Sequence, residues 1–303
     1  MDVHDYPDDL RTSVGRQPIT YLSEKFQKCD VRIVPVTGTL TDRGSEYLKA
    51  VRDINSRTSD GICLRLARDE LEDPVFLEHL VLTALDALVV SPSHTDIVLN
   101  FDFVGGDKPD RLRSVALEAL EVISRIGPFR NVVLSGTSIP AQLGRRTQGE
   151  VLRLRRVELD VWMDVMRTVR ASMPIALGDH GVIEIHHTPP GKPIRVPARI
   201  RYTTQNHHVI RRADRKDYLA LCKELLSSSD YCGPNFSFGD QRMYVGGKFS
   251  PGPAVGNDTN HHLEFVSDQV WRQIQASGRA NLFALPEFSP RPWLAQILDV
   301  EHH

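Results

Sequence analysis

Adjacent histidines are the first candidates for chemistry in this sequence, and they occur at positions 186–187, 207–208 and 261–262. Imidazole is a common zinc ligand and a general acid or base near neutral pH. Neighbouring side chains point to opposite faces of a strand and diverge by roughly 100° on a helix, so each pair readily supplies one ligand to a given ion. The chain also lacks H-E-x-x-H and H-x-H motifs, so no metal site is predicted.

The third pair lies in the segment TNHHLEFVSDQVWRQI, residues 259–274, which has apolar residues at helical spacing. Thr259 or Asn260 is the expected N-cap of this helix. His261 and His262 would then lie at the helix N-terminus, where the helix dipole disfavours their charged form. The sequence therefore predicts two neutral imidazoles that can donate and accept hydrogen bonds.

Charged and amide side chains occur within three expected strands. Alternation along TDIVLNFDFV places Asn100 and Asp102 opposite the apolar face, and the same reading places Arg65 and Arg201 on polar faces of their strands. A buried charge needs a partner or a ligand. Two interpretations follow: a structural Arg–Asp network, or an arginine-lined cavity for a carboxylate or phosphate, with Asp102 orienting an arginine or serving as base.

The segment LSGTSIP adds hydroxyl groups just after another expected strand. Ser135, Thr137 and Ser138 flank or follow Gly136, which allows close backbone approach. Hydroxyls and amides in this arrangement could hold an anion. The segment lacks the G-x-S-x-G nucleophile elbow, and a plain turn is the alternative interpretation.

Short β-branched segments alternate with longer amphipathic segments along most of the chain, as expected for parallel strands joined by crossover helices. The chain has no G-x-G-x-x-G or P-loop fingerprint, which favours a (β/α) TIM-barrel-like fold over a dinucleotide-binding open sheet. Barrel enzymes build their sites at the carboxyl ends of the strands. The expected strands are 30–38, 61–67, 95–106, 130–140, 174–185 and 197–204, and the expected helices before residue 259 are 45–55, 74–90, 111–126, 157–171 and 216–228.

Composition limits the functional classes. The 303 residues are 41% hydrophobic and carry a formal net charge of −2, so no global charge favours nucleic acid or an anionic membrane. No apolar run approaches the roughly 20 residues of a membrane span, and the first residues do not resemble a signal peptide. The four cysteines form no C-x-x-C pair, so reduced thiols in a cytoplasmic protein are expected. One domain is predicted over 1–299, and 300–303 resembles a tag remnant.

Four segments, GICLRLARDE, TDIVLNFDFV, SFGDQRMYVGG and TNHHLEFVSDQVWRQI, resemble the beta protein family of phages and bacteria. The resemblance covers most of the chain from about residue 30 onward. Family members usually open with a strand and a helix, whereas this chain begins MDVHDYPDDLRTSVG, so the first βα unit is expected to be missing or replaced. The resemblance implies a barrel-like α/β fold and a phage or anti-phage defence context, without a settled reaction.

The first functional hypothesis is a polar barrel cavity that binds or processes a phosphate-bearing ligand, either a nucleotide or a nucleic-acid end. If it is an enzyme, a hydrolase or phosphodiesterase-like activity is expected, and the sequence identifies no cofactor. The alternative is a non-catalytic subunit of a phage-defence complex, with the aromatic, proline-rich segment 282–298 docking on a protein partner or on the chain itself. The predicted catalytic residues are Asp102, His261 and His262, and the predicted ligand-binding residues are Arg65, Asn100, Ser135, Thr137, Arg201, Asp240 and Asn260.

Overall fold

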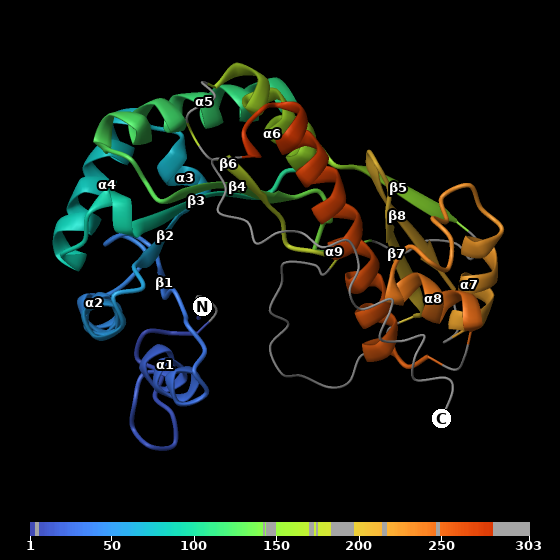
Figure 1. The fold of residues 1–303 in the computed structure, drawn as a ribbon, viewed down its shortest axis with the longest axis horizontal. Helices are drawn as coiled ribbons and strands as arrows, with labels where there is room; N and C mark the ends of the chain where they lie inside the picture. Colours follow the sequence, from blue (N-terminus) through green and yellow to red (C-terminus); the bar gives the residue numbers. More distant parts are fainter. Residues whose placement is uncertain are drawn as a thin grey trace. The chain divides into compact units, whose positions relative to one another are not determined.

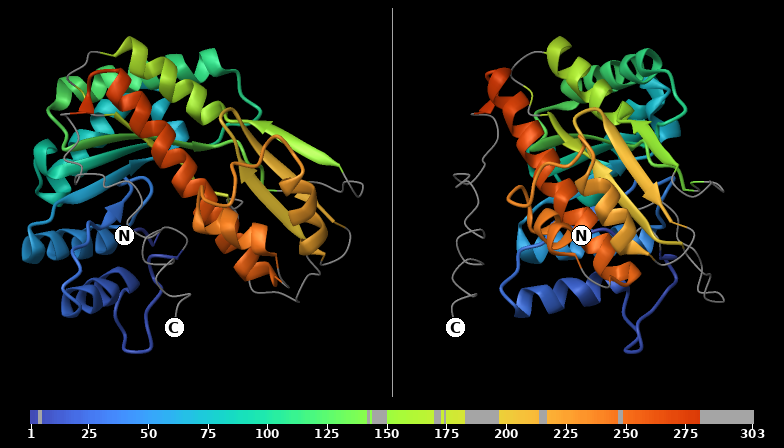
Figure 2. Two further views of the ribbon diagram at one scale, coloured as in Figure 1. Left: turned by 45° about the vertical axis from the view of Figure 1, so that its right-hand side comes forward. Right: turned by 90° about the vertical axis from the view of Figure 1, so that its right-hand side faces the viewer.

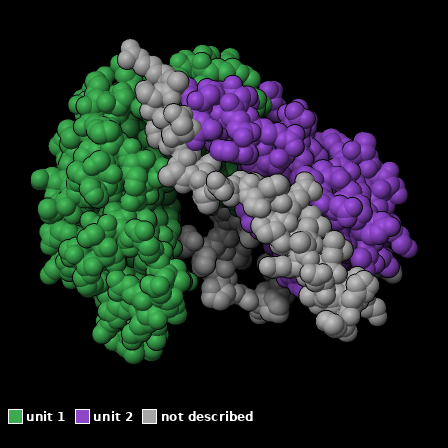
Figure 3. Space-filling view, viewed as in Figure 1, with its two compact units in different colours: residues 1–138, 157–180, 185–189 green, residues 139–156, 181–184, 190–303 purple. Residues whose placement is uncertain are grey.

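The computed structural model describes residues 1–3, 6–141, 143, 150–169, 173, 175–182, 197–213, 217–246 and 249–280. The chain divides into two compact units (Figure 3). Unit 1 contains the described residues within 1–138 and 157–180, and unit 2 contains those within 139–156, 181–184 and 190–303. The single domain expected over 1–299 stays a prediction, because compactness alone does not test whether either unit folds by itself. Residues 300–303 lie outside the described part of the chain.

Unit 1 is built on a parallel sheet of five strands in the order β1-β2-β3-β4-β6. The order follows the sequence, because each helical crossover places the next strand beside the preceding one. Its strands are β1 (Val36–Thr37), β2 (Ile62–Leu66), β3 (Thr95–Phe103), β4 (Asn131–Thr137) and β6 (Ile175–Gly178), and its helices are α1 (Pro18–Lys28), α2 (Ser45–Thr58), α3 (Arg68–Leu71), α4 (Pro74–Leu88), η1 (Pro92–His94), α5 (Pro109–Ile126) and α6 (Val157–Thr168).

Right-handed crossovers that advance in one direction place their helices on one face of the sheet. Figure 1 shows α2, α4, α5 and α6 following one another along that side of the strands. This is the arrangement expected of barrel repeats, but the sheet is open, with β1 and β6 as its edges in the described part of the chain. A closed TIM barrel is therefore not shown, because the later strands β7 and β8 pair antiparallel with each other instead of extending this sheet.

The strand faces of unit 1 follow the predicted alternation. Ile97, Leu99 and Phe101 are buried on the helix-covered side of β3. Phe103 was expected to join them but is 40% exposed. The physical reason is a register shift between β3 and β4 after Asn100, which ends the regular alternation.

Unit 2 contains a separate antiparallel sheet in the order β5-β8-β7. Residues 197–204 were predicted as a parallel barrel strand, and this is wrong, since β7 pairs antiparallel with β8. The core combines Ile200, Tyr202 and Val209 from the sheet with Leu221 and Met243 from the helices. The elements are β5 (Val151–Arg155), β7 (Arg199–Thr203), β8 (His207–Arg212), α7 (Tyr218–Leu226), α8 (Phe238–Val245) and α9 (Pro251–Ala276).

Helix α9 begins much earlier than predicted. Its N-cap is Ser250 and its first residue is Pro251, so Thr259 and Asn260 do not cap it and the adjacent histidines lie well inside it. The glycines and prolines before residue 259 concealed this start. Proline is tolerated in the first turn of a helix, because its missing N–H would have no intrahelical acceptor there.

The described helices include none that is long and apolar enough to cross a membrane. All four cysteines are free thiols, as expected. Burial raises the pKa of Cys63 to about 12 and that of Cys222 to about 11, which makes both poor nucleophiles at neutral pH.

Helices α8 and α9 approach each other closely at Gly239. A Cβ atom there would lie 2.2 Å from the carbonyl oxygen of Asn257 in α9. We expect Gly239→Ala to lower the free energy of unfolding by about 1–3 kcal/mol, because the two backbones would have to separate. Gly256→Ala is the matched control in α9, where nothing lies within 4 Å, and should raise it by about 0.5–1 kcal/mol. Urea unfolding measures both, and a stabilising Gly239→Ala would contradict the close approach.

Candidate functional site

Polar side chains gather on the face of the unit 1 sheet opposite its crossover helices. Register pairs Arg65 of β2 with Val98 of β3, and Asn100 of β3 with Ser135 of β4. Because Val98 and Asn100 are two residues apart on one strand, Arg65, Asn100 and Ser135 share that face. This part of the predicted polar set is confirmed as one face of one sheet.

Asp102 lies at the carboxyl end of β3, in an unusual backbone conformation. Its φ is 52°, in the left-handed region that non-glycine residues rarely adopt. Its carboxylate Oδ1 accepts a hydrogen bond from Asn100 Nδ2 at 2.7 Å, and the side chain is exposed. Strained backbone of this kind concentrates at functional sites. Asn100 therefore orients an exposed carboxylate at the edge where open α/β sheets bind ligands.

Arg65 is held by ion pairs that leave its hydrogen-bonding capacity unused. Its guanidinium lies 3.3 Å from Asp2 Oδ2 and 3.9 Å from Asp42 Oδ2. Arg68, by contrast, donates two hydrogen bonds to Asp107, at 2.8 and 2.9 Å. Within the described part of the chain the Arg65 side chain makes no hydrogen bond, and it is 18% exposed. Its planar donors can thus still receive an anion.

His180 follows β6 at the same carboxyl edge of the sheet, and the sequence analysis did not select it. Burial lowers the pKa of His180, while Asp102 and Asp179 oppose that shift and Arg65 adds to it. Its Nε2 is buried and has no hydrogen-bond partner among the described residues. The imidazole is therefore mainly neutral at pH 7, near Asp102 and Arg65. The expected strand 174–185 contained His180, so the signal that could have found it is the Gly178–Asp179 step, where the observed strand β6 ends.

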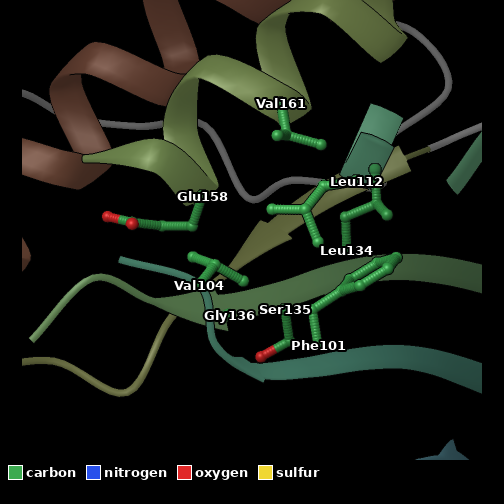
Figure 4. A pocket seen from close by; sticks show the side chains of 8 residues that line it. All are labelled: Phe101, Val104, Leu112, Leu134, Ser135, Gly136, Glu158 and Val161. Atoms are coloured by element: carbon green, nitrogen blue, oxygen red, sulfur yellow. The ribbon is translucent and has the colours of Figure 1, made fainter. Parts of the chain in front are cut away.

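The hydroxyl-rich segment at the carboxyl end of β4 does not form one anion cradle. Figure 4 shows a small, mainly apolar pocket whose lining includes Ser135, Gly136 and Glu158. The Ser135 hydroxyl is directed away from the apolar side chains there. Thr137 is 1% exposed, and the hydroxyl of Ser138 donates to Glu158 Oε2. Ser135 of this segment lies on the face of Arg65.

The predicted residues Asn260, His261 and His262 lie on α9 in unit 2, and this helix runs beside the free edge of β7 (Figure 1, Figure 2). Asp258 Oδ2 accepts the backbone N–H of Arg201 at 2.9 Å. Three residues further along α9, His261 Nε2 lies 2.8 Å from the carbonyl oxygen of Thr203. These backbone groups face away from β8, so the helix supplies the partners that another strand would have supplied.

A buried network continues from His261. Its Nδ1 lies 2.8 Å from Asp240 Oδ2, and its ring stacks on Tyr202 with centroids 3.7 Å apart. Asp240 also accepts hydrogen bonds from Tyr202 and Ser237. Since both ring nitrogens of His261 have fixed partners and the side chain is 0% exposed, this geometry favours a structural role for it. The catalytic role stays a prediction without geometric support.

Other predicted residues also serve packing in unit 2. His262 is 0% exposed, and its Nδ1 lies 2.8 Å from the hydroxyl of Thr203. Asn260 Oδ1 accepts the backbone N–H of Gly239 at 2.7 Å. Arg201 lies 3.9 Å from Asp258 and belongs to a different sheet from Arg65, so the expected single barrel interior does not contain both arginines.

No group of three or more histidine, cysteine, aspartate or glutamate side chains among the described residues could hold a metal ion. The pair at 186–187 and the aromatic segment 282–298 lie outside those residues.

Unit 1 has an open parallel sheet with helices on one face and polar groups at its carboxyl edge, and unit 2 has an antiparallel sheet. The chain is therefore a mixed α/β protein. The chain belongs to the beta protein family, whose sequence model matches residues 1–268. The resemblance found in the sequence is therefore confirmed, and the match also includes the first 30 residues. No curated protein and no solved structure matches the chain. Family membership suggests a phage-related protein.

Proposed function

We propose that the carboxyl edge of the unit 1 sheet binds a phosphate-bearing ligand, a nucleotide or a nucleic-acid end, in a phage-related or anti-phage defence context. The observation that carries the proposal is Arg65, a largely buried guanidinium whose ion pairs leave it without hydrogen bonds in the described part of the chain. Arginine recognises phosphate through paired N–H donors, and such charge-assisted bonds are about twice as strong as neutral ones.

Neighbouring groups could perform acid–base chemistry on the bound ligand. Asp102 presents an exposed carboxylate that Asn100 orients, and a carboxylate can accept a proton from an attacking water. His180 has a lowered pKa, so its imidazole is available in the neutral form. Arg65 would stabilise the negative charge that develops on phosphate oxygens. A hydrolase or phosphodiesterase-like activity is the reaction class that this arrangement supports.

Loss of the Arg65 guanidinium should weaken the binding of a phosphate-bearing ligand. We expect Arg65→Ala to weaken binding of inorganic pyrophosphate by about 10- to 100-fold, because a charge-assisted hydrogen-bonded contact is worth about 1.5–3 kcal/mol. Isothermal titration calorimetry measures the dissociation constant. Arg32→Ala is the matched control: Arg32 belongs to the same unit, pairs with Asp60 and is 86% exposed, so its loss should leave the affinity unchanged.

Thermal unfolding of both variants separates loss of binding from loss of fold. Equal affinities for the wild type and a folded Arg65→Ala variant would contradict the proposal. If no protein in the series binds pyrophosphate or a nucleotide, the non-catalytic subunit becomes the preferred function.

A further inference from the structure

The first residues of the chain run beside β1 and reach the proposed site. The backbone N–H of Val36 donates to the carbonyl oxygen of Met1 at 2.8 Å, which fixes this segment against the edge strand. Val3 is 5% exposed and packs in a cluster with Ile19 and Leu48, on the side covered by helices. Neighbouring side chains of an extended segment point to opposite sides. Asp2 therefore points toward the polar face of the sheet.

On that face the Asp2 carboxylate takes the position of an anionic ligand at Arg65. Oδ2 of Asp2 lies 3.3 Å from Nη1 of Arg65, and the aspartate side chain is 37% exposed. The pair makes no hydrogen bond within the described residues, unlike the two-fold contact of Arg68 with Asp107. Because the carboxylate partner of this ion pair is exposed, the pair contributes only about 0–1 kcal/mol. The contact is thus weak enough for a ligand to replace it.

We propose that Asp2 is a built-in competitor for the anion site at Arg65, and that a phosphate group displaces its carboxylate on binding. The inference rests on the proposed function, because it assumes that Arg65 receives the phosphate. A phosphate offers more negative charge and more acceptor oxygens than a carboxylate, so it can form the paired hydrogen bonds that Asp2 does not. Asp42, at 3.9 Å, is the second carboxylate beside the guanidinium and helps to orient it.

Calorimetric titration of the full chain with inorganic pyrophosphate tests the competition. Asp2→Asn should tighten binding by about 2- to 5-fold, since it removes an ion pair of ordinary exposed strength that the ligand must break. Asp9→Asn is the control for a general change in charge, because Asp9 is exposed in the same N-terminal segment. Asp2→Glu keeps the carboxylate and should stay close to the wild type.

A second pair of measurements keeps the inference separate from the proposed function. In an Arg65→Ala background, Asp2→Asn should change the affinity less than 1.5-fold, roughly the precision of such a titration. Equal binding by the wild type and Asp2→Asn would overturn the competitor role and leave the phosphate site standing. If Asp9→Asn tightens binding as much as Asp2→Asn does, the effect is general electrostatics and the role is also overturned. No pyrophosphate binding by any variant would overturn both proposals.

Discussion

Replacing Asp240 by alanine is expected to lower the free energy of unfolding by about 3–5 kcal/mol, the largest effect predicted for this chain. Asp240 is 0% exposed and accepts hydrogen bonds from Tyr202 and Ser237, while His261 lies 2.8 Å from it. Its removal leaves those three polar groups buried without their acceptor. The same variant also loosens His261, which completes the free edge of β7 through Thr203.

Guanidinium chloride unfolding followed by circular dichroism measures this loss. Asp268→Ala is the control, because Asp268 lies on α9, is 47% exposed and, among the described residues, pairs only with Arg272 one turn further along the helix. That variant should differ from the wild type by less than about 0.5 kcal/mol. A loss below about 1 kcal/mol for Asp240→Ala would mean that the network is not a structural centre of unit 2.

The second large effect is a pH dependence centred on Asp258. This carboxyl is 1% exposed, and burial raises its pKa well above the ordinary value of 3.8, although the backbone N–H and the guanidinium of Arg201 oppose the shift. A raised pKa means that the folded protein holds a proton which the unfolded chain has released. The contribution of Asp258 to stability is therefore full below pH 3.8 and is lost as the pH rises through the folded pKa.

Asp258→Asn removes that dependence while keeping an oxygen acceptor for the Arg201 N–H. We expect the stability of this variant relative to the wild type to increase as the pH rises above 4, by about 1.4 kcal/mol per pH unit within the titration range. Urea unfolding at several pH values measures the difference. Asp268→Asn, at a 47% exposed position of the same helix, is the control for the loss of a carboxylate from α9. If the free energies of unfolding of the wild type and of Asp258→Asn varied with pH in the same way, Asp258 would be ionised in the folded protein.

The sequence predicted most of the individual strands and helices of unit 1, but it did not predict that their sheet would stay open instead of closing into a barrel. Alternation fixes which residues of a strand share a face, so Arg65 and Asn100 were correctly placed together. A row of parallel strands closes into a barrel only if its first and last strands pair. These strands are far apart in the sequence, so no local pattern predicts their pairing. The same limit applies to β8: no strand was predicted over His207–Arg212, although this segment is the central strand of the antiparallel sheet.

The candidate site was predictable only in part, because structural and functional polar groups look alike in a sequence. Asp102 and His261 both attracted attention as acid–base candidates. The structure leaves Asp102 exposed and oriented by Asn100, but it gives both ring nitrogens of His261 a fixed partner. His180 was missed because its significance depends on the carboxyl end of β6, which ends at Gly178.

A crystal structure of the protein grown with pyrophosphate would show directly whether Arg65 binds phosphate. We expect phosphate density within hydrogen-bonding distance of the Arg65 guanidinium, on the face shared with Asn100 and Ser135, and the Asp2 carboxylate moved away from Arg65. Phosphate bound elsewhere, with the Asp2–Arg65 pair intact at a saturating concentration, would contradict it.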